Sequence, residues 1–180
     1  MPLPRVLLSA PVAVAVALQA GAAWAAPGHA HQHGTAQMEL ALEGETLSIA
    51  LTVPLDSLLG FERALRTSAE RAAADAVLQK MGNLGAMLVP SPGAACTPAA
   101  PVVRAEVLTA KPAARAEPQH AEMQAELVFQ CRQPAQLKQV RVALFEAFPR
   151  LHRIQAQWVT PGAQGQAQLR PRSPVLVLQK

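Results

Sequence analysis

The sequence predicts an α+β fold, a mostly antiparallel sheet of about eight short strands with one main helix and one disulfide. Three observations carry this prediction. After residue 36, apolar residues mostly recur at every second position, which is typical of strands with one buried face. One Ala-rich stretch has the spacing and the start signal of a helix. The chain also contains two cysteines, Cys96 and Cys131.

The first 25 residues are expected to be a secretory signal peptide. Arg5 supplies a positive start, residues 6–20 are apolar, and Ala23-Trp24-Ala25 has the A-x-A form of a signal peptidase site. The alternative is a retained membrane anchor. It is less favoured because the apolar run is shorter than the roughly 20 residues that a spanning helix needs.

Cleavage after residue 25 leaves about 155 residues, enough for a domain with a core of its own. We expect a flexible, His-containing leader over residues 26–36 and a single α+β domain over residues 37–180. The 16 Lys and Arg residues are dispersed, and the chain has only 4 Phe, 2 Trp and no Tyr. This composition argues against a nucleic-acid surface built on basic patches and stacking aromatic rings.

Two alternating runs, residues 37–42 and 46–53, predict a β-hairpin around the turn Glu43-Gly44-Glu45. Pro54 ends the second strand, and residues 55–62 form a compact apolar connector. The side chains expected to face the core are Met38, Leu40, Leu42, Leu47, Ile49, Leu51 and Val53.

The main helix is predicted from Ala69 to about Met87. It begins after Thr67-Ser68-Ala69-Glu70, which matches a capping box, and the prolines beyond residue 88 end it. Gly82 and Gly85 weaken its second half, by up to ~1 kcal/mol each relative to alanine.

The second half of the chain contains further alternating runs that predict strands. They are residues 102–108, 123–131, 140–144, 153–160, 166–169 and 175–178. Pro134 opens a short helical turn through Leu137. Residues 109–119 are rich in Pro and Ala without an apolar period and are expected to be a surface loop.

Cys96 and Cys131 are expected to form a disulfide, because an exported chain meets an oxidising environment. The bridge would close a loop of about 35 residues, which stabilises the fold by about 3.5–4 kcal/mol in the chain-entropy model. The alternative is a Cys2His2-type metal site. It is less supported because neither cysteine has a C-x-x-C partner.

The segment His29-Ala30-His31-Gln32-His33-Gly34 is the main candidate for metal binding. Alternate side chains of an extended segment point the same way, about 6.5–7 Å apart. Zinc–imidazole bonds are about 2.0–2.1 Å long, so two or three of these histidines can bind one ion. The alternative is a solvated leader without specific binding.

Further ligands must come from elsewhere in the chain or from water. His120 is the best candidate because it flanks a polar loop. Carboxylates are candidates of lower grade, namely Glu39, Glu62, Glu117 and Glu122. His152 lies between Arg150 and Arg153, which disfavours a bound cation and favours a surface histidine.

Catalysis has little support in the sequence. No G-x-S-x-G, H-E-x-x-H or nucleotide-binding glycine loop is present. Asp56, one of only two aspartates, stands beside Ser57 at an expected strand end, where a turn explains it. We therefore expect no enzymatic activity.

The chain resembles the ZrgA-like family of periplasmic zinc-binding proteins, over essentially the whole mature length. The segments that carry the resemblance are the H-A-H-Q-H-G leader, residues 58–64, Ala95-Cys96, His120-Ala121-Glu122, Cys131, residues 144–149, and Gly165-Gln166 with the final apolar strand. The resemblance implies periplasmic zinc binding in support of a zinc ABC importer or its binding protein.

The family's leader histidines correspond to His29, His31 and His33, and the histidine before the strand of the second cysteine corresponds to His120. With Glu122, these form the predicted zinc site of a zinc-binding domain over residues 37–180. Many relatives carry a long His/Asp/Glu-rich run in the middle loop, whereas residues 109–119 have no histidine and one acid. We therefore expect one or two ions and no bulk store.

Two alternatives stay open. The chain can be an envelope interaction module in which the histidines are incidental. The metal can instead be copper or nickel, because copper(II) outcompetes zinc at most nitrogen sites.

Overall fold

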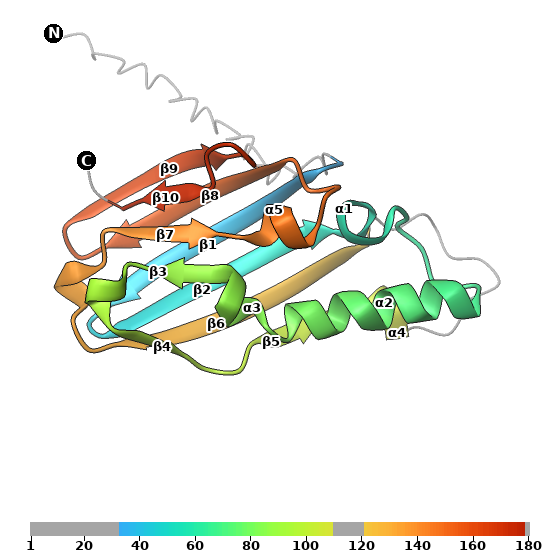
Figure 1. Cartoon of the computed structure of the whole chain (residues 1–180), viewed down its shortest axis with the longest axis horizontal. Coiled ribbons are helices and arrows are strands. Elements are labelled where there is room, and N and C mark those ends of the chain that lie inside the picture. Colours follow the sequence, from blue (N-terminus) through green and yellow to red (C-terminus); the bar gives the residue numbers. More distant parts are fainter. Residues whose placement is uncertain (1–32, 110–120, 179–180) are drawn as a thin grey trace, which may run out of the picture. The chain divides into compact units, whose positions relative to one another are not determined.

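The computed structural model describes residues 33–109 and 121–178 (Figure 1). The expected signal peptide, His29, His31 and His120 lie outside the described residues. Among the residues that are described, no helix is long and apolar enough to cross a membrane.

Seven strands of the described chain form the main sheet, in the order β4-β6-β2-β1-β8-β9, with β5 also paired to β6. Their bounds are β1 (Thr35–Glu43), β2 (Thr46–Pro54), β4 (Cys96–Pro98), β5 (Val102–Arg104), β6 (Glu122–Cys131), β8 (Arg153–Thr160) and β9 (Ala163–Leu169). All neighbours are antiparallel except β1 and β8, which are parallel. The expectation of a mostly antiparallel sheet is confirmed.

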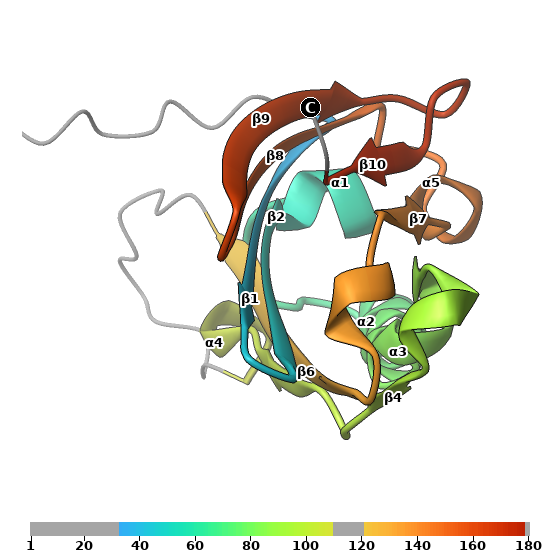
Figure 2. The ribbon, with the colours of Figure 1, turned by 90° about the vertical axis from the view of Figure 1, so that its left-hand side faces the viewer.

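A smaller sheet has the order β10-β7-β3. It comprises β3 (Leu88–Pro90), β7 (Gln139–Val142) and β10 (Val175–Val177). The helices are α1 (Leu55–Leu59), α2 (Ser68–Met81), α3 (Leu84–Met87), α4 (Glu106–Thr109) and α5 (Leu144–Ala147), with 3-10 turns at Pro92–Ala94 and Pro134–Gln136. Figure 2 shows the main sheet as a curved layer, with α1, α2 and the small sheet on its inner side. The predicted α+β class is confirmed.

The core lies between the inner face of the main sheet and these elements. All the residues expected to face inward from the hairpin are buried, each at most 8% exposed. Their partners on β6, α2 and the small sheet include Leu127, Met81 and Val140, which are also buried. Full burial of one such side chain stabilises the fold by about 1.5–3 kcal/mol, so the alternating pattern sets the strand register.

The start of the main helix is confirmed, and its end is not where the sequence predicted it. The capping box is present, with the Glu70 amide donating to Thr67 Oγ1 at 3.1 Å. However, α2 ends at Met81, and residues up to Met87 form the separate helix α3. The break falls at Gly82, whose low helix propensity favours an interruption there.

Two of the predicted strands are shorter than expected. The run 102–108 is a strand only as far as Arg104, and α4 follows it. The run 140–144 ends as a strand at Val142, and Leu144 begins α5. In both places the apolar alternation continues past the end of the sheet pairing, so periodicity alone could not locate the boundary.

Cys96 and Cys131 form the predicted disulfide. They occupy directly paired positions on β4 and β6, so the bridge ties a three-residue edge strand to the ten-residue strand beside it. The alternative of a Cys2His2-type metal site is therefore excluded in this structure.

Candidate metal-binding site

His33, the last of the three leader histidines, is hydrogen-bonded to Asp56. The distance between His33 Nδ1 and Asp56 Oδ2 is 2.9 Å. The His33 side chain is 67% exposed and that of Asp56 27%. An imidazole that donates through Nδ1 presents its lone pair on Nε2, which is the form in which histidine binds a metal ion.

The backbone of Gly34 fixes His33 in this position from two sides. The Gly34 amide donates to Ser57 Oγ at 2.9 Å, and Ser57 is 1% exposed. The Gly34 carbonyl accepts from the amides of His152 at 2.8 Å and Arg153 at 3.0 Å. The leader is thus anchored at residues 33–34, between α1 and the start of β8.

Glu122, another predicted ligand, lies at the same end of the sheet. Glu122, the first residue of β6, is paired with Pro54 at the end of β2. The next amide along, that of Leu55, donates to the carbonyl of Ala121 at 2.8 Å. We call this region the α1 corner and define it as His33, Gly34, Leu55, Asp56, Ala121 and Glu122 (Figure 1).

The described residues by themselves do not form a metal site. Within residues 33–109 and 121–178, no three His, Cys, Asp or Glu side chains gather in a group that could hold an ion. His33 and Asp56 are brought together, and Glu122 is half-buried on the strand beside them. The remaining predicted ligands, His29, His31 and His120, lie outside the described residues.

His152 lies next to this anchor in a positively charged environment. Together with His33, it lines a cavity of about 390 Å³ that also contains Arg153 and Arg170. An added Cβ on Gly34 would lie 3.0 Å from Cδ2 of His152, so the ring packs against the backbone there. The two arginines make this cavity a poor environment for a cation.

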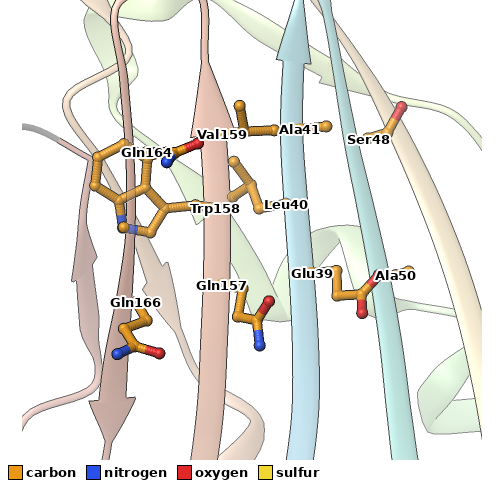
Figure 3. Close-up of a pocket in the computed structure, with 11 residues that line it drawn as sticks. Glu39, Leu40, Ala41, Ser48, Ala50, Gln157, Trp158, Val159, Gln164 and Gln166 are labelled. Atoms are coloured by element: carbon orange, nitrogen blue, oxygen red, sulfur yellow. The ribbon is translucent and has the colours of Figure 1, made fainter. Parts of the chain in front are cut away.

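A second cavity, of about 870 Å³, is lined by residues of the main sheet and not by residues of the α1 corner. It crosses β2, β1, β8 and β9, and Gln157, Gln164 and Gln166 line it (Figure 3). Glu39, one of the lower-grade candidates, is the one carboxylate in this lining. Neutral amides around a single carboxylate offer a metal ion few ligands.

Asp56 is the residue of this corner that the sequence analysis does not select as a candidate. It is the second residue of α1, just beyond Pro54 at the end of β2. Its contact with His33 joins residues 23 positions apart, and no motif in the sequence marks it.

A comparison with curated proteins finds no match for the chain. A family model, that of the ZrgA family of zinc uptake proteins, matches residues 30–178. The match includes the α1 corner, both cysteines and the last strand. The description of this family is one of zinc uptake and names no enzyme. The chain belongs to the ZrgA family of zinc uptake proteins.

Proposed function

We propose that this protein binds zinc in the periplasm and assists zinc uptake as an accessory to a zinc ABC importer. Family membership supports a role in zinc uptake. The structural observation that carries the proposal is the His33–Asp56 hydrogen bond, because a carboxylate bonded to one ring nitrogen is the usual second partner of a metal-bound histidine.

The proposed ligands are His33 with His29 and His31 from the leader, and His120 with Glu122 from the start of β6. The α1 corner supports this set, because residue 33 is anchored there and the chain after residue 120 enters the sheet there. Zinc is bound by three or four nitrogen, oxygen or sulfur ligands, so both groups are needed for a complete site.

Export from the cytoplasm is supported by two features. Residues 1–25 have the pattern of a cleaved signal peptide. The Cys96–Cys131 disulfide is of the kind that persists in an oxidising compartment such as the bacterial periplasm.

The test is a calorimetric titration of zinc chloride into the mature protein and into a variant with His29, His31 and His33 all changed to Ala. We expect one or two ions per wild-type chain and at least a hundredfold weaker binding by the variant. Equal zinc binding by both proteins would contradict the assignment of these histidines as ligands. No zinc binding by the wild type would contradict the proposed function. His152→Ala is the matched control and should bind zinc as the wild type does.

The metal itself needs a separate measurement, because copper(II) binds nitrogen ligands more tightly than zinc does. We expect elemental analysis of the protein isolated from its own periplasm to find zinc. Copper or nickel in its place would contradict the assignment to zinc.

Co-purification of an importer component with and without chelator tests the partner, and we expect chelation to weaken the association. A partner retained unchanged in chelator would favour the envelope interaction module.

A further inference from the structure

We infer that Asp56 is a positioning residue that holds the imidazole of His33 in the tautomer able to bind zinc through Nε2. The inference rests on the proposed function and adds a residue that is itself not a ligand. It starts from the 2.9 Å contact between His33 Nδ1 and Asp56 Oδ2.

The carboxylate of Asp56 is held by a rigid part of the chain. Its neighbour Leu55 is fully buried and donates its amide to Ala121 at 2.8 Å. The carbonyl of Asp56 accepts the amide of Gly60 at 2.8 Å, which closes α1. The backbone of Asp56 is therefore positioned by hydrogen bonds of the fold, independently of His33.

The chemistry of the pair decides which nitrogen of His33 is available. A neutral imidazole carries one hydrogen, on Nδ1 or on Nε2, and an ionised carboxylate can only accept. The hydrogen bond to Asp56 therefore places the hydrogen on Nδ1 and the lone pair on Nε2. The loss of such a partner of a metal-bound histidine typically weakens metal affinity by about 10–100-fold.

The main chain beside His33 is also held in place. Gly34 is held by Ser57 on one side and by His152 and Arg153 on the other, so the main chain next to His33 is fixed before any ligand arrives. A ligand that is already oriented loses less conformational freedom when it binds. The main chain that carries His33 is thus held in place before zinc binds.

The first test needs no zinc. Long-range ¹H–¹⁵N correlation spectra of the zinc-free protein at pH 8 report which ring nitrogen of His33 carries the hydrogen. We expect the hydrogen on Nδ1 in the wild type and a shift towards Nε2 in Asp56→Ala. A wild-type ring with its hydrogen on Nε2 would overturn the inference, whatever the zinc affinity proves to be.

The second test is a double-mutant cycle read by zinc titration. Asp56→Ala should weaken zinc binding by about 10–100-fold. In a His33→Ala background the same change should have no further effect, because Asp56 acts through His33. The matched control is Asp75→Ala on the exposed side of α2, which should leave the affinity unchanged.

The outcomes separate this inference from the proposed function. Loss of affinity in both backgrounds would make Asp56 a direct ligand and overturn the positioning role. Unchanged, wild-type zinc affinity in Asp56→Ala would also overturn the positioning role. If the wild-type protein bound no zinc, the proposed function would be wrong. The tautomer measurement would still report on the His33–Asp56 pair.

Discussion

The indole ring of Trp158 on β8 covers Gly165 on β9, its direct cross-strand partner. A Cβ atom added to Gly165 would lie 2.8 Å from Cζ2 and 3.0 Å from Cε2 of the ring. Trp158 is 5% exposed and is part of the core. Glycine at position 165 therefore allows the ring to lie directly on the backbone of the edge strand.

Gly165→Ala should destabilise the protein by about 1–3 kcal/mol, because the added methyl group forces the buried ring or the strand to shift. Urea unfolding followed by circular dichroism measures the change. Gly162→Ala is the matched control, since a Cβ there meets nothing within 4 Å. Its stability should be unchanged or higher by up to about 1 kcal/mol. Equal losses in the two variants would contradict the contact with the ring.

Loss of the disulfide should lower the free energy of unfolding by about 3.5–4 kcal/mol, the chain-entropy value for a loop of about 35 residues. The variant is Cys96→Ala with Cys131→Ala, measured by urea unfolding. Reductant should lower the wild type to the level of the variant and leave the variant unchanged. Zinc affinity should be the same in both proteins while they are folded, because both sulfur atoms are in the bridge. Loss of zinc binding in the variant would contradict this.

Glu70 makes stability depend on pH in the acid range. The Arg63 side chain, at 2.7 Å, is the main cause that lowers the pKa of Glu70 from 4.5 to about 2, and the Arg66 amide adds to it. In the unfolded chain Glu70 takes up a proton near its ordinary pKa, before it does so in the folded protein. The stabilisation by ionised Glu70 is therefore complete above the unfolded pKa and is lost as the pH falls towards 2.

The expected result is a stability difference between the wild type and Glu70→Gln that is constant above about pH 5.5 and shrinks between about pH 4.5 and 2. Thermal unfolding across this range measures it. In an Arg63→Gln background the main cause of the pKa shift is absent, so the pH dependence of that difference should become smaller. A difference that grew at low pH would contradict the assignment.

The sequence was sufficient for elements whose signal is local or repeats many times. The hairpin of β1 and β2, the capping box at Thr67 and the strand β8 were all predicted, because long alternation or a cap motif marks them. β3 and β4 were missed, since three residues cannot show a period. The parallel pairing of β1 with β8 could not be read either, because it joins segments more than 100 residues apart.

The candidate site was predictable in part for the same reason. The alternate spacing of the histidines predicts that His33 is a ligand. A single aspartate after a strand, such as Asp56, matches no motif that would predict a role. Asp56 lies in α1, just beyond the end of β2, and its contact with His33 depends on how the chain turns there.

The anchor at Gly34 gives the last prediction. Gly34 has a φ of 75°, and a Cβ there would lie 3.0 Å from Cδ2 of His152 and 3.2 Å from the carbonyl oxygen of Arg150. Gly34→Ala should destabilise the protein by about 1–2 kcal/mol for the left-handed backbone alone. The contact with the Arg150 backbone should also move His33 away from Asp56, so zinc affinity should fall as well.

Gly44→Ala separates the two effects. Gly44 has a φ of 57° in the turn between β1 and β2, and a Cβ there meets nothing within 4 Å. This variant should show a similar backbone cost of about 1–2 kcal/mol with unchanged zinc affinity, because the turn lies at the opposite end of the hairpin from the α1 corner. Zinc titration and urea unfolding of both variants provide the comparison. If folded Gly34→Ala bound zinc as tightly as Gly44→Ala, the anchor would not be what prepares His33 for the metal ion.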